Sequence, residues 1–199
     1  MASLDGQTVL VVGGSSGMGQ AIAAVAAAEG AKVTIAARNL DKLDAAARAI
    51  GLGTLARQLD VTDEAAVQAF FASHDTIDHL VMTSHASSVV TGAISSLSNM
   101  TLVAARAFME TKFWGPFTVV KHALPRLTER ASITFFSGAA GARKLLPDHT
   151  AIGATNGAVE AFARQLSKEL APRRVNTVAA GLVRTPTYDG MPEAARAAM

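Results

Sequence analysis

The sequence predicts an α/β fold in which a doubly wound parallel β-sheet carries helices on both faces. Short β-branched runs alternate with longer Ala-rich segments of helical period from residue 8 to about residue 180. A glycine-rich turn joins the first such run to the first Ala-rich segment. Since 199 residues suit one hydrophobic core, we expect residues 1–199 to form a single domain.

Each element of this fold follows from a local residue pattern. Apolar, β-branched runs predict strands at residues 8–12, 32–36, 54–59, 77–82, 133–136 and 174–178. Segments of helical period predict helices at residues 17–29, 40–50, 63–73, 99–127 and 151–170. We expect Thr62 to cap the helix at 63–73 and Gly115-Pro116 to kink or break the helix at 99–127. The tail after the last strand is expected to be irregular.

Composition excludes several classes of protein. Half of the residues are hydrophobic and 17% are charged, which is far from the composition of a disordered chain. The absence of cysteine excludes disulfides, a thiolate nucleophile, an iron–sulfur cluster and a cysteine zinc site. His74 and His79 lack the spacing of a zinc hydrolase motif and have no carboxylate cluster beside them, so we expect no metal.

The charge pattern and hydropathy bear on partners and location. A net charge of +2, without a basic patch interleaved with aromatic residues, argues against a nucleic-acid partner. No apolar stretch reaches the roughly 20 residues that a membrane span needs. The first residues lack the basic region and apolar core of a secretion signal. We therefore expect a soluble, cytoplasmic protein without a membrane partner.

The glycine-rich turn predicts a site for the pyrophosphate of a dinucleotide, and hence a Rossmann-type domain. Unpaired amides and the positive end of the helix dipole attract phosphate at the start of a helix, and glycine lets the phosphate approach. Alone, the pattern also fits a structural turn; the surrounding strands and helices favour the dinucleotide. The residues expected to contact the cofactor here are Gly13, Ser15, Ser16, Gly17, Met18 and Gly19.

The end of the second predicted strand indicates which dinucleotide binds. NAD sites usually carry an acidic residue there, whereas this chain has Arg38 followed by Asn39. A guanidinium suits the 2′-phosphate of NADP, so we expect NADP(H), although an exposed arginine at a helix start is the alternative. Asp60, after the third strand, is placed to accept a hydrogen bond from the adenine amino group, or else caps a helix or turn.

With these motifs in place, nearly the whole chain resembles the short-chain dehydrogenase/reductase family. The glycine spacing, residues 59–62 and residues 174–186 carry the resemblance. It implies that Asp60 and Val61 lie at the adenine, Ser84 near the cofactor, and Val183 and Thr185 at the nicotinamide carboxamide. It also implies a homodimer or homotetramer formed through residues 99–127 and 151–170, a small-molecule substrate, and a substrate loop at residues 185–199. Relatives continue into a further helix and strand, so we expect the sheet to be truncated at the C-terminal edge.

The same resemblance locates departures at the catalytic positions. The family uses a tyrosine, a lysine four residues later, a serine and an asparagine. Ile152, Asn156, Gly138 and Lys112, respectively, stand at those positions. His85 also stands where the family has a glycine. Isoleucine supplies no proton, and carbonyl reduction needs one.

Other side chains are therefore candidates for the catalytic role. Lys112, His85 and His149 are able to supply a proton if the fold aims them at the cofactor, and Ser137 is able to polarise a carbonyl. The alternatives are a solvated lysine, hydrogen-bonded surface histidines and a serine that caps a strand. Phe108, Phe113, Trp114 and Phe117 have helical spacing that indicates core or a subunit face.

Two functions remain open at this level. The first is an NADP(H)-dependent oxidoreductase with a non-standard proton donor, which acts on an unidentified small carbonyl or alcohol. The second is a dinucleotide-binding protein without turnover, which serves as a sensor or a partner subunit.

Overall fold

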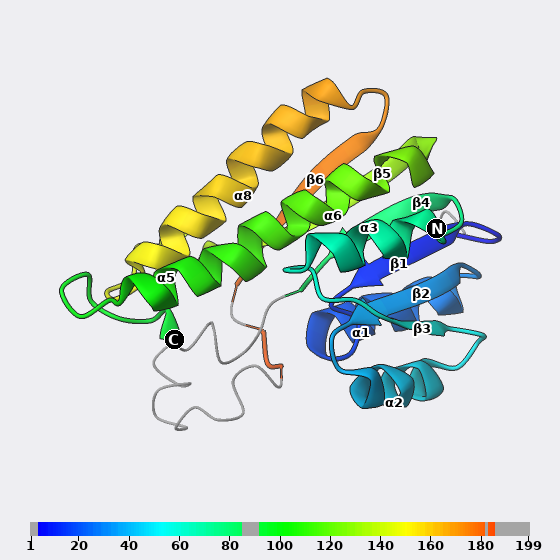
Figure 1. Cartoon of the computed structure of the whole chain (residues 1–199), viewed down its shortest axis with the longest axis horizontal. Coiled ribbons are helices and arrows are strands. Elements are labelled where there is room, and N and C mark those ends of the chain that lie inside the picture. The colour runs from blue at the N-terminus through cyan, green and yellow to red at the C-terminus, as the bar shows by residue number, and fades with distance from the viewer. Residues whose placement is uncertain (1–3, 85–91, 182, 186–199) are drawn as a thin grey trace.

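The structure is a computed structural model that describes residues 4–84, 92–181 and 183–185. These residues form a six-stranded sheet with the order β3-β2-β1-β4-β5-β6, in which every neighbouring pair is parallel (Figure 1). The strands are β1 (Thr8–Val12), β2 (Lys32–Ala37), β3 (Leu55–Gln58), β4 (Ile77–Met82), β5 (Leu127–Gly138) and β6 (Arg174–Ala180). The predicted Rossmann-type sheet is confirmed.

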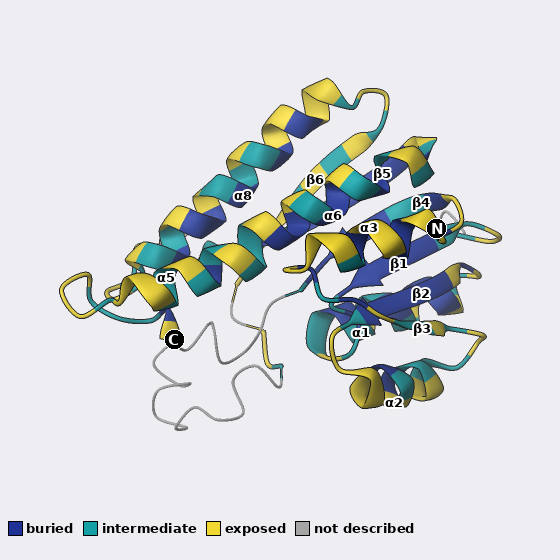
Figure 2. Cartoon of the chain, viewed as in Figure 1, coloured by how far each residue is buried: buried dark blue, intermediate teal, exposed yellow. Residues whose placement is uncertain are grey.

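Helices cover both faces of the sheet. They are α1 (Gly17–Ala28), α2 (Leu40–Ile50), α3 (Glu64–Ala72), α5 (Leu102–Met109), α6 (Gly115–Ala123), α7 (Ala139–Ala142) and α8 (Thr150–Glu169). Side chains of α1 and α2 share one hydrophobic core, and side chains of α3, α6 and α8 share the core on the opposite face. Figure 2 shows the buried strands between these layers.

The alternation of β1 side chains explains why the sheet has two cores. Val9 and Val11 face the α1 and α2 side, whereas Leu10 and Val12 face the α3, α6 and α8 side. All four are at most 2% exposed. A strand that is buried on both faces has a continuous run of apolar residues, and that run is what predicted β1.

The long helix predicted over residues 99–127 is wrong in its ends, whereas the interruption expected near Gly115-Pro116 is present. Thr101 caps α5 by accepting a hydrogen bond from the amide of Ala104, so the helix begins at residue 102. A π-turn, η1 (Glu110–Trp114), then joins α5 to α6, and a 3₁₀ turn follows at residues 124–126. β5 begins at Leu127, inside the predicted helix and before the strand expected at residue 133.

The π-turn has a covalent cause in Pro116. Proline has no amide hydrogen to bond the carbonyl four residues before it, and its ring crowds that carbonyl. Here that carbonyl belongs to Lys112, and the amide of Gly115 bonds the carbonyl of Glu110, five residues back. The break expected at Gly115-Pro116 is thus a widened turn centred on Lys112.

The helix cap predicted at Thr62 is also wrong. Asp63 is the N-cap of α3, and its carboxylate accepts a hydrogen bond of 3.0 Å from the amide of Ala66. Thr62 instead donates through its hydroxyl and its amide to Asp60. Asp63 stands directly before the first residue of the helix. As the cap it is preferred over Thr62, because an aspartate side chain at the positive end of the helix dipole stabilises the helix.

The topology places one end of the sheet for ligand binding. β1 and β4 are neighbours, although the chain passes through β2 and β3 between them. The described helices that follow β1 and β4 in the chain, α1 and α6, pack on opposite faces of the sheet, and such a reversal typically leaves a crevice between the two strand ends. No helix within residues 4–84, 92–181 and 183–185 is long and apolar enough to cross a membrane.

Candidate functional site

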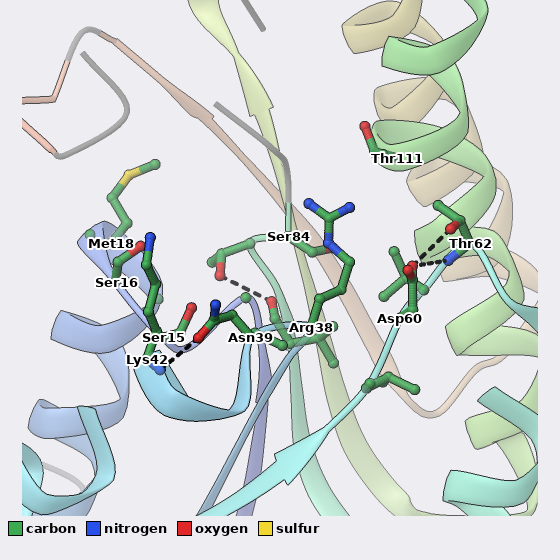
Figure 3. A pocket seen from close by; sticks show the side chains of 18 of the residues that line it. Ser15, Ser16, Met18, Arg38, Asn39, Lys42, Asp60, Thr62, Ser84 and Thr111 are labelled. Atoms are coloured by element: carbon green, nitrogen blue, oxygen red, sulfur yellow. Dashed lines mark hydrogen bonds between the residues drawn. The ribbon is translucent and has the colours of Figure 1, made fainter. Parts of the chain in front are cut away.

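A pocket of about 370 Å³ lies at the carboxyl ends of β1, β2 and β4 (Figure 3). This volume is within the range of about 300–1,000 Å³ typical of small-molecule sites. The residues expected at the cofactor that line the pocket are Gly13, Ser15, Ser16, Gly17, Met18, Gly19, Arg38, Asn39, Asp60, Val61, Ser84 and Thr185. Val183, the remaining expected residue, is 40% exposed and does not line it.

The N-terminus of α1 opens into this pocket without a side-chain cap. Ser16 is the N-cap residue in an extended conformation, and its hydroxyl makes no capping hydrogen bond. The first turn of α1 carries no acidic side chain. The first amides of α1 are therefore donors at the positive end of a helix dipole, which is a favourable place for an anion.

Glycine is required at two positions of the turn by close contacts. A Cβ at Gly19 would lie 2.3 Å from the carbonyl oxygen of Gly13. Gly13 has φ of +95°, and a Cβ there would lie 2.6 Å from the amide nitrogen of Ser84. The hydroxyl of Thr83, which donates to the carbonyl of Val12, is also within 2.6 Å of both added atoms. These glycines bring α1 close to β1 and β4.

Two basic side chains line the β2 side of the pocket. Arg38 follows β2, and its carbonyl accepts a 2.7 Å hydrogen bond from Gln58 of β3. Asn39 caps α2 by accepting from the amide of Lys42 at 2.8 Å. In the view of Figure 3 the Arg38 side chain rises between Ser84 and Asp60, and Lys42 lies beside Ser15 and Ser16. This side of the pocket suits a phosphate.

Asp60 and Ser84 bound the pocket from β3 and β4. One carboxylate oxygen of Asp60 accepts from the amide of Thr62 at 3.0 Å and from its hydroxyl at 2.8 Å, which is the turn role left open by the sequence. The hydroxyl oxygen of Ser84 is buried and has no hydrogen-bond partner within the described structure. Because buried hydroxyl groups are normally paired, this one is available to a ligand.

Ile152 and Asn156 lie on α8 at 7% and 2% exposure, respectively. Ile152 packs in a small apolar cluster with Ala93 and with Phe108 of α5. Asn156 donates from Nδ2 to the carbonyl of Ala140 at 3.2 Å, while its buried Oδ1 has no partner in the part of the chain that is described. A Cβ at Gly138 would lie 3.0 Å from this Nδ2, so Gly138 leaves room for Asn156.

Ser137 is committed to an interaction outside the pocket. Its hydroxyl donates to Oε1 of Glu160 at 3.0 Å, and Arg143 donates to Oε2 of the same carboxylate at 3.0 Å. Burial raises the pKa of Glu160, but the hydrogen bonds from Arg143 and Ser137 outweigh it and lower that pKa. The hydroxyl proton of Ser137 is thus occupied rather than aimed at a ligand.

The remaining proton-donor candidates are dispersed. Lys112 lies in η1 and is partly buried, next to Thr111, which lines the pocket. His149 is partly buried, and its Nδ1 lies 2.6 Å from the carbonyl oxygen of Pro147. His85 lies outside the described residues. No group of three or more metal-ligating side chains occurs within residues 4–84, 92–181 and 183–185.

Comparisons with known proteins place the chain in a family. The family model described as enoyl-(acyl carrier protein) reductase matches residues 12–199. A short-chain dehydrogenase/reductase of Stachybotrys chlorohalonatus, ATR9, is 35% identical over 98% of this chain and 80% of its own length. The chain belongs to the short-chain dehydrogenase/reductase family.

Solved structures of family members share the fold. A short chain dehydrogenase/reductase family protein superposes with a TM-score of 0.86 at 30% identity, covering 98% of this chain and 82% of its own. A small-chain dehydrogenase solved in complex with NADPH has a TM-score of 0.78 at 29% identity, covering 98% of this chain and 79% of its own.

The sequence analysis did not predict several residues that line the pocket of this protein. Lys42, Thr83 and Thr111 line it, as do Val12, Ala37, Leu59 and Thr62. Lys42 was foreseeable, because it follows Asn39 by one helical turn and shares its helix face. Thr83 was not, since its role depends on contacts with glycines 64 to 70 residues away in the chain. The family's catalytic positions at Ile152 and Asn156 stay a prediction from the resemblance.

Proposed function

We propose that residues 1–199 form one dinucleotide-binding domain of an NADP(H)-dependent oxidoreductase that acts on a small carbonyl or alcohol substrate. The observation that carries the proposal is the uncapped N-terminus of α1 in a pocket that also holds Arg38. An anion there meets helix amides, a guanidinium and an ammonium without a carboxylate on α1 to repel it.

The residues present fit the cofactor. The first amides of α1 would bind the pyrophosphate, and Arg38, with Lys42 nearby, would bind the 2′-phosphate of the adenosine. Ser84 would pair its buried hydroxyl with a ribose, and Asp60 and Val61 would flank the adenine. Val183 and Thr185 are proposed to hold the nicotinamide carboxamide. When bound, the cofactor supplies or accepts a hydride.

Calorimetric titration with NADPH and NADH tests the cofactor part of the proposal. We expect NADPH to bind more tightly, and Arg38→Ala to weaken NADPH about 10–100-fold because a charged hydrogen-bonded contact is lost. NADH affinity should change little. Arg48→Ala is the matched control, because Arg48 lies in the last turn of the same helix that begins at the pocket, but outside the pocket. Equal losses for both nucleotides would contradict NADP preference.

A second candidate function is a dinucleotide-binding protein without turnover. The buried apolar environment of Ile152 and the pairing of Ser137 with Glu160 favour it, since neither side chain offers a proton to a substrate. An NADPH-consumption assay over aldehydes, ketones, quinones and imines separates the two. Tight NADPH binding without turnover supports the binding protein, whereas turnover of any compound supports the enzyme.

We also propose that the chain forms a homodimer or homotetramer through α5, α6 and α8. Large apolar side chains are exposed along the first two of these helices and their junction: Leu102, Val103, Trp114 and Phe117. Exposed apolar side chains that gather in this way typically mark an interface. Light scattering coupled to size-exclusion chromatography should report two or four copies, and a monomeric mass would contradict this part of the proposal.

A further inference from the structure

The π-turn between α5 and α6 carries Lys112, a partly buried amine to which the proposed cofactor site gives no role. Lys112 stands in the centre of η1 (Glu110–Trp114), where the chain makes a hydrogen bond to the fifth residue back instead of the fourth. Such π-turns are rare and concentrate at functional sites. Within the described structure the ammonium of Lys112 has no carboxylate or carbonyl partner, whereas the exposed Lys121 of α6 pairs with Glu64 at 2.8 Å.

Lys112 and Asn156 lie on segments that pack against each other. Phe108 and Ile152 belong to the same apolar cluster, and further along the same two segments Phe113 and Phe162 contact each other with ring centroids 5.7 Å apart. The two segments run side by side in Figure 1. Lys112 follows Phe108 by four residues, and Asn156 follows Ile152 by four, so both residues lie between the Phe108–Ile152 cluster and the Phe113–Phe162 contact or next to it.

Asn156 presents an unpaired acceptor at this level. Its Oδ1 is buried and lacks a partner in the described residues, and Gly138, at the carboxyl end of β5, leaves it room. The pocket reaches Ser84, which follows β4, and Thr185, which follows β6. Because β5 lies between those strands, the end of β5 with Asn156 lies between two walls of the pocket. Thr111 brings the turn that holds Lys112 to the same place.

We propose that Lys112 is the proton donor to the oxygen of the carbonyl substrate, with Phe108 and Ile152 as an apolar wall nearby and the Asn156 carbonyl oxygen, unpaired in the described structure, as the acceptor that would orient the ammonium once substrate binds. This inference rests on the proposed function as an NADP(H)-dependent oxidoreductase. In the reduction the substrate carbon accepts a hydride from the reduced nicotinamide, which is oxidised. The carbonyl electron pair moves to oxygen, and that oxygen takes one proton from the ammonium of Lys112. The neutral amine then regains its proton from water.

The protonation state of Lys112 fits this role. Burial lowers the pKa of Lys112 to about 8, so the ammonium predominates at pH 7 and is a far stronger acid than an ordinary lysine. Below pH 8 the donor is charged, and above pH 8 it is lost. The reduction rate should therefore fall as the pH rises through about 8, while the rate of alcohol oxidation, which needs the neutral amine, should rise.

Charged groups on the packed elements do not alter that direction. Burial is the sole cause of the shift at Lys112. Glu160 of α8 is paired with Arg143, and Lys121 and His122 of α6 are paired with Glu64. The other charged residues of η1 and of the helices packed against it are Arg106, Glu110, Arg164, Lys168 and Glu169.

The test compares Lys112→Ala, Lys112→Arg and the control Lys121→Ala in NADPH binding and in reduction of a panel of aldehydes and ketones. We expect NADPH affinity to stay within about threefold in all three, since Lys112 does not line the pocket. Both Lys112 variants should lose about 10²–10⁴-fold in kcat and lose the decline above pH 8, because arginine keeps the charge but does not release a proton. Lys121→Ala should behave as the parent protein.

A readout independent of turnover is the NMR titration of ¹³C-methylated lysines. One resonance should titrate near pH 8 and vanish in Lys112→Arg. A Lys112 resonance that titrates at the usual value for lysine overturns the proposal. So does activity that survives in Lys112→Ala or is rescued by Lys112→Arg, and so does NADPH binding without reduction of any carbonyl in the panel. Absence of NADPH binding instead overturns the proposed function itself.

Discussion

The N-terminus of α1 differs from the N-termini of α2 and α3, the two helices that follow it in the chain. Asn39 and Asp63 cap α2 and α3 with side-chain oxygens, and each of these helices has an acidic residue in its first turn. α1 has neither a capping bond nor an acidic residue. Capping groups satisfy helix amides and stabilise a helix by about 1 kcal/mol.

This difference separates amides used for folding from amides kept for a ligand. α2 and α3 satisfy their first donors internally and gain stability from them. α1 leaves its donors open in the pocket, where a bound anion can accept their hydrogen bonds. The contrast is the physical basis for assigning phosphate binding to α1.

The largest effect on stability is expected from a substitution that prevents α1 from packing closely against the sheet. Gly19→Ala places a Cβ 2.3 Å from the carbonyl oxygen of Gly13, so backbone must move. We expect the free energy of unfolding to fall by about 3 kcal/mol or more. Urea denaturation measures the change.

Gly157→Ala is the matched control for that variant. Gly157 also lies in a helix, α8, but a Cβ there meets nothing within 4 Å. Alanine should stabilise that helix by about 0.5–1 kcal/mol, because glycine is entropically unfavourable in helices. A small loss at Gly19, similar to that of a surface site, would show that close helix approach is not what the glycine serves.

Ser16→Asp converts the open terminus of α1 into one that resembles α3. The aspartate should cap the helix and raise the free energy of unfolding by about 1 kcal/mol. The same charge repels phosphate, so NADPH affinity should fall about tenfold or more. Thermal denaturation and calorimetric titration check the two changes. Ser16→Ala, which removes no capping bond, should alter stability by less than about 0.5 kcal/mol. Unchanged NADPH affinity in Ser16→Asp would contradict phosphate binding at α1.

Asp63→Ala is expected to have the smallest effect, on stability alone. It removes the hydrogen bond to the amide of Ala66 and should cost about 1 kcal/mol of unfolding free energy, with NADPH affinity unchanged. Thr62→Ala is the comparison, because Thr62 bonds Asp60 rather than the helix. If the threonine variant is the more destabilised of the two in urea, the cap assignment is contradicted.

Residue patterns along the chain predicted inner strands of the sheet such as β1 because these strands are buried on both faces. The apolar run at Thr8–Val12 and the helix at Leu40–Ile50 were found at their observed bounds. Burial decides these elements locally, through period and composition. The segment around Pro116 was harder, since periodicity does not distinguish a continuous helix from one that widens by a single residue. A proline fixes which carbonyl loses its partner, but not how the chain compensates.

Some residues of the candidate site were likewise predictable from local sequence patterns, and others were not. The glycine turn and Arg38 follow from positions next to strand ends, and the structure brings them together with Asp60 and Ser84 in one pocket. Ser137 was a candidate for polarising a substrate carbonyl, with a strand cap as the alternative; its hydroxyl instead donates to Glu160, 23 positions away. That partner depends on how α8 packs on β5, which no local pattern encodes. His85 and the residues after Thr185 lie outside the described structure.

A crystal structure grown in excess NADPH tests the central assignment most directly. We predict electron density for the pyrophosphate against the first turn of α1, between Gly13 and Gly19, and for the 2′-phosphate within hydrogen-bond distance of the Arg38 guanidinium. Density elsewhere, or a pocket left without nucleotide at saturating NADPH, would contradict the account.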